Sequence, residues 1–155
     1  MPKRIEDVIN ELGFYITEPK GTSMFPLLKP GFGDVCIVKI DGEINKHDVV
    51  LYIRKSGSYV LHRVLDIQGD EYICCGDNQW TLERGVTRDM IIGRLESWYA
   101  KGKKHTVTDK RYLRYVKFWC KSLKRRKRIL GFFHLRWRIQ DFCYKVYRKL
   151  FKKGN

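Results

Sequence analysis

Short β-rich runs that follow one another at close spacing constrain the fold of this chain more than any other feature. Turn residues such as Asp41-Gly42 and Lys55-Ser56-Gly57 separate these runs, and no helical pattern lies between them. Strands joined by such short turns pair with their neighbours. The sequence therefore predicts a mainly β domain over residues 14–100, with a partly closed antiparallel sheet. The expected strands are Asp34–Ile40, Asp48–Arg54, Ser58–Leu65, Glu71–Cys75 and Met90–Trp98.

Residues 1–13 predict a short amphipathic helix. Ile5, Val8 and Leu12 recur at helical spacing, and Gly13 supplies a stop. Acidic side chains interrupt this segment, whereas the apolar core of a secretory signal peptide contains none. No apolar run approaches the ~18–20 residues of a membrane-spanning helix. We therefore expect neither a signal peptide nor a transmembrane helix, and a chain that starts in the cytosol.

The C-terminal third carries the positive charge of the chain. Residues 1–100 hold 12 Lys and Arg against 15 Asp and Glu, whereas residues 101–155 hold 20 against 2. Apolar side chains recur at spacings of three and four in this basic segment, for instance at Tyr112, Val116 and Trp119. Since 155 residues suit one domain, the sequence predicts a β body followed by a basic helical hairpin over residues 109–154.

Three uses of this tail stay open from the sequence. It could lie in a membrane interface, bind nucleic acid through its clustered cations, or pack on the β body with a solvated outer face. The apolar load is heavier than a purely electrostatic arm needs, which favours an anionic membrane surface on the cytoplasmic side. The expected membrane contacts are Trp119, Arg125, Arg126, Phe132, Phe133, Trp137 and Phe151.

Cysteine and histidine offer no pattern typical of a metal site. The five cysteines are odd in number and include no C-x-x-C pair, and the four histidines lack ligand spacing. Such a set favours free thiols in a reducing compartment. We expect no metal and no cofactor.

Three residues in the β-rich region are suited to nucleophilic catalysis. Ser23 lies in the loop before the first expected strand, His62 lies inside a strand, and Asp77 follows another strand. A serine hydroxyl is barely ionised at neutral pH, whereas imidazole, with an ordinary pKa near ~6.5, can accept its proton and pass it to a leaving group. The three could therefore act as nucleophile, base and orienting acid.

The segments around these residues resemble the ordered motifs of the signal peptidase I family of membrane-associated serine peptidases. Ser23-Met24-Phe25-Pro26 matches the Ser-Met-x-Pro segment of the family, His62-Arg63-Val64 its (Lys/His)-Arg-Val strand, and Gly76-Asp77-Asn78 its Gly-Asp-Asn box. Both Gly33-Asp34-Val35 and His47-Asp48-Val49-Val50 resemble its Gly-Asp-(Val/Ile)-Val strand. Residues 91–95 resemble the strand that closes its core.

The resemblance implies a peptidase of the Ser-His branch, with Ser23 as nucleophile and His62 as base. Acids in and shortly after the Gly-Asp-Asn box support the histidine in that branch, so Asp77 is the preferred orienting acid and Glu83 is kept in reserve. The position that often carries an oxyanion-binding hydroxyl is Gly21 here, which leaves the Ser23 N–H as the expected donor. The residues expected around the oxyanion and substrate are Gly21, Thr22, Ser23, Met24 and Pro26.

The leading hypothesis is a signal-peptidase-like serine endopeptidase that cleaves a peptide or precursor protein. Its tail would hold it peripherally at a membrane in place of the family's anchor. The resemblance implies an extended substrate, added along a strand edge, with small residues beside the cut. The alternative is a non-catalytic or regulatory module that binds peptides or a membrane, and nucleic-acid binding is less favoured. A self-cleaving phage-type repressor would use Lys as its base and need more than the 22 residues that precede Ser23.

Overall fold

The computed structural model describes residues 3–31, 33–133, 135–136 and 139. Trp137 and Phe151, two of the expected membrane contacts, lie outside the described residues. The helices are α1 (Ile5–Leu12), the short 3₁₀ helix η1 (Arg88–Met90), α2 (Lys110–Trp119) and a further helix over 123–133. The strands are β1 (Phe14–Thr17), β2 (Val35–Val38), β3 (Val49–Ile53), β4 (Tyr59–Gln68), β5 (Glu71–Cys75), β6 (Glu83–Thr87), β7 (Ile91–Ala100) and β8 (Lys103–Thr106).

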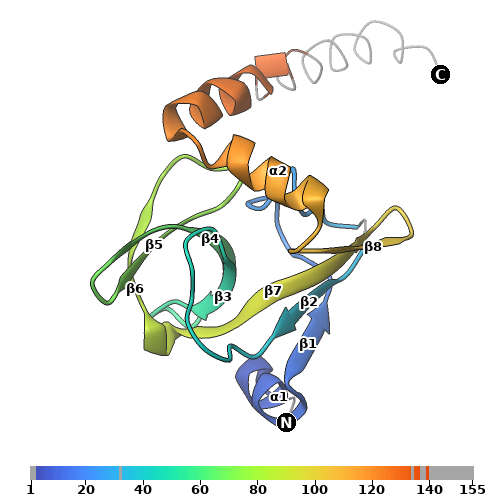
Figure 1. The fold of residues 1–155 in the computed structure, drawn as a ribbon, viewed down its shortest axis with the longest axis vertical. Coiled ribbons are helices and arrows are strands. Elements are labelled where there is room, and N and C mark those ends of the chain that lie inside the picture. Colours follow the sequence, from blue (N-terminus) through green and yellow to red (C-terminus); the bar gives the residue numbers. More distant parts are fainter. Residues whose placement is uncertain (1–2, 32, 134, 137–138, 140–155) are drawn as a thin grey trace, which may run out of the picture. The chain divides into compact units, whose positions relative to one another are not determined.

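In the part of the chain that the structure describes, eight strands form one antiparallel sheet. Their order is β1-β2-β7-β3-β4-β5-β6, and β8 pairs with β7. The sheet curves strongly but is not closed into a barrel, since β1 and β6 end the order without pairing with each other (Figure 1). A short helix precedes the sheet and two helices follow it. These findings confirm the mainly β, partly closed antiparallel fold expected from the sequence.

Three strands were not expected from the sequence. β1 and β8 have only four residues each, and β6 reads Glu-Arg-Gly-Val-Thr, with Gly85 in the left-handed region at φ +77°. β6 and β8 carry little β-favouring composition of their own, whereas the four residues of β1, Phe-Tyr-Ile-Thr, favour strands but form too short a run to be recognised alone. They become strands because each pairs with a longer or more apolar neighbour: β1 with β2, β6 with β5, and β8 with the end of β7.

The core of the sheet lies in two clusters of buried side chains. The larger cluster includes Ile9 of α1, Met24 of the loop after β1, and Tyr112 of α2. The smaller one gathers around Val50, Tyr52 and neighbouring strands. The helices α1 and α2 lie at opposite ends of the sheet (Figure 1), and both bury the apolar face that their sequence pattern predicts.

The chain divides into two compact units, Met1–Lys121 and Ser122–Asn155. The first contains the sheet, α1 and α2. The described part of the second contains the helix over 123–133, in which Phe132 and Phe133 are exposed. None of the helices seen in the described ranges combines the length and the apolar character needed to cross a membrane.

Candidate active site

The loop between β1 and β2 carries Ser23 on a run of tight turns. Gly21 adopts the left-handed conformation at φ +76°, which glycine adopts at little steric cost. The side chains of Met24 and Leu28 are buried in the core, and the N–H of Leu28 donates to the carbonyl oxygen of Met24 over 2.9 Å. This anchoring holds Ser23 half-buried.

The turn over residues 76–78 packs directly on the backbone of Ser23. The N–H of Asn78 donates to the carbonyl oxygen of Ser23 over 2.7 Å. A Cβ atom on Gly76 would lie only 2.6 Å from the same oxygen. The close approach therefore requires glycine at position 76, which gives a physical reason for the Gly-Asp-Asn segment.

Ser23 and His62 line the same pocket. The pocket has a volume of about 410 Å³ and receives His62 from β4, Ser23 from the loop after β1, and further residues from α1 and β1. Its wall is largely apolar, with contributions from Ile5, Met24, Leu28, Val35, Ile37, Leu51, Val60 and Leu61. The fold thus brings the two expected catalytic residues, which are far apart in the sequence, to one cavity.

The hydroxyl of Ser23 and Nε2 of His62 make no hydrogen bond, to each other or to any other residue in the described ranges. Catalytic hydrogen bonds are often long in enzymes without substrate and tighten when substrate binds. The shared pocket is therefore compatible with the expected pairing of Ser23 and His62, although the two side chains are not hydrogen-bonded to each other.

Contacts to Nδ1 set the tautomer of His62. The hydroxyl of Tyr52 donates to Glu83 Oε2 over 2.7 Å, and the same hydroxyl oxygen lies 3.3 Å from Nδ1. Nδ1 is also 3.5 Å from Glu83 Oε2. Because burial and the bond to Glu83 raise the pKa of Tyr52, its proton stays on the phenol and points to Glu83. Both oxygens can accept a proton from Nδ1, which favours the tautomer with the lone pair on Nε2.

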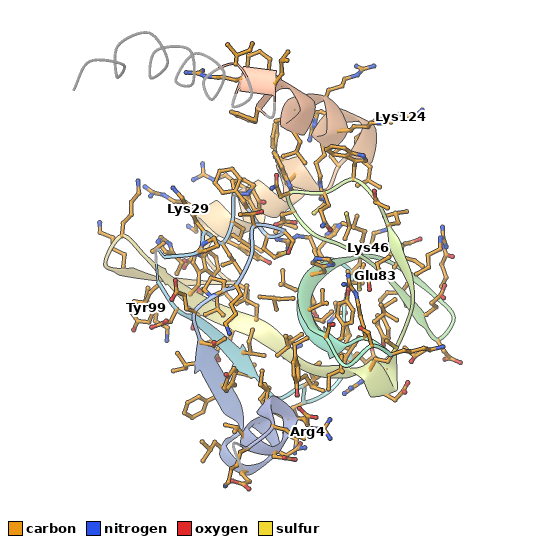
Figure 2. All side chains as sticks on the ribbon, turned by 180° about the vertical axis from the view of Figure 1, so that it is seen from behind. Arg4, Lys29, Lys46, Glu83, Tyr99 and Lys124 are labelled. Atoms are coloured by element: carbon orange, nitrogen blue, oxygen red, sulfur yellow. The ribbon has the colours of Figure 1, made fainter. Side chains whose placement is uncertain are left out.

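Burial favours a neutral imidazole at His62, beside a carboxylate that stays ionised. Burial lowers the pKa of His62 from its ordinary 6.5, and the charge of Glu83 opposes this shift. Arg54 donates to both oxygens of Glu83 over 2.6 Å, and this hydrogen bonding lowers the pKa of Glu83. Glu83 lies beside the curved strands β3 and β4 (Figure 2). The arrangement suits a general base whose protonated form is stabilised by a nearby anion.

Asp77, the orienting acid preferred from the sequence, contacts Arg63 instead of His62. Arg63 Nε and Nη2 donate to the two carboxylate oxygens of Asp77 over 2.9 and 2.7 Å, and both side chains are completely buried. His62 and Arg63 are neighbours in β4, so their side chains point to opposite faces of the strand. Glu83, the acid held in reserve, occupies the place beside His62.

Helix α2 covers the Arg63–Asp77 pair. The hydroxyl of Tyr115 donates to Asp77 Oδ2, and the indole N–H of Trp119 donates to the carbonyl oxygen of Asp77, both over 2.9 Å. Arg63 Nη1 donates to the hydroxyl of Tyr112 over 2.9 Å. A buried ion pair is tolerated when further hydrogen bonds satisfy its polar atoms, and α2 supplies several of them.

The residues expected around the oxyanion divide into two groups. Gly21, Ser23 and Met24 line the pocket that contains His62. Thr22 is exposed, and Pro26 lines a second pocket of about 210 Å³. The N–H of Ser23 makes no hydrogen bond within the described ranges, so this donor can serve an oxyanion as expected.

The structure places the expected membrane contacts in different surroundings. Trp119 is buried against Asp77, and Arg126 is also buried, so neither side chain is presented to a lipid surface. Arg125 is half-buried, whereas Phe132 and Phe133 are exposed. The exposed apolar side chains of α2 are instead Leu113 and Phe118.

Metal-ligating side chains do not gather at the site. The described ranges contain no group of three or more His, Cys, Asp and Glu residues placed to hold a metal ion. Cys74 and Cys75 form no disulfide within the described ranges and are buried in β5, and burial raises the pKa of Cys74 to about 12. The thiol of Cys74 is therefore protonated at neutral pH.

Tyr52 and Arg54 are the site residues that sequence reasoning missed. They stand two apart in or just after β3, so they share a face of that strand. The pairing of Val50 with His62 brings this part of β3 next to the histidine. The sequence does show Tyr52 and Arg54 at alternate positions in and just after the strand that precedes His62. Their place beside the histidine depended, however, on the register in which β3 pairs with β4.

Comparisons with protein-family models, with curated proteins and with solved structures find no match.

Proposed function

We propose that the protein is a serine endopeptidase similar to the Ser-His branch of the signal peptidase I family. The observation that carries the proposal is the placement of Ser23 and His62 on one pocket, with Nδ1 of the histidine committed to Tyr52 and Glu83. The order of the short motifs along the chain supports the same assignment.

In this mechanism Ser23 Oγ attacks the scissile carbonyl while Nε2 of His62 takes the hydroxyl proton. Glu83 stabilises the resulting imidazolium, and Arg54 keeps Glu83 ionised. The N–H of Ser23 donates to the oxyanion. His62 then gives its proton to the leaving amine, and water attacks the acyl-enzyme with His62 again acting as base.

The proposed substrate is an extended peptide. β1 ends the order of the sheet, and its alternate residues Tyr15 and Thr17 line the pocket. A peptide added to the open edge of β1 would direct every second side chain towards the apolar wall. This supports a peptide or precursor protein with small or apolar side chains beside the cut.

A serine-directed fluorophosphonate probe tests the proposal directly. We expect the probe to label Ser23 in the full chain, as located by mass spectrometry of digested protein. Ser23→Ala and His62→Gln should both abolish labelling while the thermal unfolding midpoint stays close to that of the wild type. Ser56→Ala, which alters an exposed serine in the β3–β4 turn, is the matched control and should label normally.

A peptide library then tests for cleavage, with products identified by mass spectrometry. Wild-type protein should cut peptides that Ser23→Ala leaves intact. A wild-type protein that neither labels at Ser23 nor cuts any peptide would favour the non-catalytic binding module.

Peripheral membrane association is the second part of the proposal. The outer face of α2 carries basic side chains at Lys110, Arg111, Arg114 and Lys117. Leu113 and Phe118 are about half exposed on the same helix, at 54% and 52%. Exposed apolar groups among cations are typical of a helix that lies on an anionic bilayer.

Vesicle binding tests this surface. The full chain should co-sediment with vesicles that contain phosphatidylglycerol and not with pure phosphatidylcholine. Since each cation near an anionic surface contributes about 1 kcal/mol, the combined change Lys110→Gln, Arg114→Gln and Lys117→Gln should weaken binding by roughly a hundredfold. The control change Lys39→Gln with Lys55→Gln alters exposed lysines elsewhere and should have little effect. Tighter binding to duplex DNA than to anionic vesicles would favour the nucleic-acid alternative.

A further inference from the structure

Two side chains of α2 converge on Asp77, the middle residue of the turn that contacts Ser23. Tyr115 donates to the carboxylate of Asp77 and Trp119 donates to its main-chain oxygen, both over 2.9 Å. The rings of Tyr115 and Trp119 are stacked with their centroids 5.8 Å apart. Helix α2 therefore holds both the side chain and the backbone of Asp77.

The same turn fixes the peptide group of the proposed nucleophile. Asn78, the next residue after Asp77, donates its N–H to the carbonyl oxygen of Ser23 over 2.7 Å. Gly76, the preceding residue, lies against that oxygen so closely that no side chain fits. A short hydrogen-bonded path thus runs from α2 through Asp77 and Asn78 to Ser23.

The contacts from α2 exceed what charge compensation of Asp77 requires. Arg63 already donates to both carboxylate oxygens of Asp77. The bond from Trp119 goes to the main-chain oxygen, so it restrains the orientation of the turn and adds nothing to the neutralisation of the carboxylate. Both bonds come from a helix outside the resembled motifs, which end near residue 97.

We propose that Tyr115 and Trp119 are positioning residues for Ser23, acting through Asp77 and the turn over residues 76–78. The inference rests on the proposed peptidase function and extends it to a helix that the family motifs do not include. Loss of either bond lets the turn shift, and Ser23 moves with it because Asn78 is bonded to its carbonyl oxygen.

The test compares Tyr115→Phe and Trp119→Phe with wild type in the full chain. Each change removes one donor and keeps an aromatic ring in place. We expect faster hydrogen exchange at the Asn78 amide, which donates to Ser23. Because a displacement of about 1 Å can cost 10²-fold in rate, the maximal rate at which Ser23 displaces fluoride from the fluorophosphonate probe should fall about ten- to a hundredfold. The probe concentration at half-maximal rate should change little.

Two controls separate positioning from general loss of stability. Tyr99→Phe removes the hydroxyl of an exposed tyrosine in β7 and should leave both readouts unchanged. Glu83→Gln should shift the pH midpoint of probe labelling and leave Asn78 exchange unaltered, because Glu83 contacts Nδ1 of His62. Tyr115→Phe and Trp119→Phe should instead speed Asn78 exchange and leave the pH midpoint unaltered. If Trp119→Phe fails to fold, Tyr115→Phe decides the question alone.

Unchanged Asn78 exchange in both variants would overturn the inference. Faster Asn78 exchange with an unaltered rate of probe labelling at Ser23 would overturn it as well, because the turn would then not set the position of Ser23. Wild-type protein that the probe does not label would sink the peptidase proposal instead. That failure is recognisable because Asn78 exchange still reports whether α2 holds the turn.

Discussion

At the scale of single residues, one phenolic proton determines what His62 can do. Tyr52 keeps this proton and directs it to Glu83, which favours the tautomer of His62 with the proton on Nδ1 and the lone pair on Nε2. With the opposite arrangement, Nε2 would carry the proton and the imidazole could not act as a base towards Ser23. The hydrogen bonds of Tyr52 thus contribute to chemistry that Tyr52 does not itself perform.

The pH dependence of the reaction between Ser23 and the fluorophosphonate probe tests the protonation state of His62. Only the neutral imidazole accepts the proton of Ser23, so the rate should rise with pH and reach a plateau. Because burial lowers the pKa of His62 from 6.5, we expect the midpoint below pH 6.5. The rate at pH 6.5 should exceed half of the plateau, as measured by single-turnover reaction with the fluorophosphonate probe. A midpoint above 6.5 would contradict this assignment.

The two acids near His62 should respond differently to substitution. Glu83→Gln removes the charge that raises the pKa of His62. The pH midpoint of probe labelling should therefore move to still lower pH, and the plateau rate should fall. Asp77→Asn leaves the buried Arg63 without its anion and should lower the free energy of unfolding by about 3–5 kcal/mol. Urea unfolding and pH–rate profiles of both variants provide the measurements. If the pH midpoint changed only in folded Asp77→Asn and not in Glu83→Gln, Asp77 and not Glu83 would be the acid that supports His62.

At the scale of elements, the turn over residues 76–78 packs so closely on the backbone of Ser23 that position 76 has no room for a side chain. Gly76→Ala would put a Cβ atom 2.6 Å from the carbonyl oxygen of Ser23. Because this oxygen belongs to the backbone, relief requires movement of the Ser23 loop, and overpacking of this kind costs roughly 1–3 kcal/mol. We expect a lower urea midpoint together with slower labelling of Ser23.

Gly57→Ala provides a comparison for Gly76→Ala. Gly57 also lies in a turn, and its added Cβ atom would meet nothing within 4 Å. It has a positive φ of 81°, so some loss of stability is expected from backbone strain. Labelling of Ser23 should nevertheless stay at the wild-type rate, and an equal loss in both variants would argue against a specific effect at position 76.

The strands and the two catalytic candidates could be predicted because their signals are local. Alternating β-branched residues and turn residues mark β2 to β5 and β7, and the resembled motifs mark Ser23 and His62. The strands β6 and β8 could not be predicted, since pairing with neighbours rather than composition makes them strands. The residues of β1 favour strands, but its four residues are too short a run to be recognised without its partner β2. The choice between Asp77 and Glu83 depended on which face of β4 each acid approaches, and that is fixed only by the tertiary fold.

At the scale of the whole molecule, every residue assigned to the site lies in the unit Met1–Lys121. The unit contains the complete sheet and both α1 and α2. The second unit adds basic and exposed aromatic residues, including Lys124, Phe132 and Phe133. The proposed chemistry therefore belongs to the first unit, whereas the proposed membrane contacts are divided between α2 of the first unit and the residues of the second unit.

A chain that ends at Lys121 tests this separation. We expect it to unfold cooperatively and to react with the fluorophosphonate probe at Ser23 at a rate close to that of the full chain. Its binding to anionic vesicles should be weaker, because the cations and aromatic residues of the second unit are missing. Calorimetry, probe labelling and vesicle co-sedimentation measure the three properties, and loss of labelling in a folded protein would show that the second unit contributes to the site.

The adjacency of His62 and Arg63 in β4 makes this stretch intolerant of insertions and deletions. Removing one residue between the β3–β4 turn and His62 would exchange the faces of the two side chains. A guanidinium would then enter the apolar cavity, and Val64 would replace Arg63 beside the buried carboxylate of Asp77. The proposed catalysis and the folding would fail through the same slip, so point substitutions rather than changes in length are the route by which this strand can diversify.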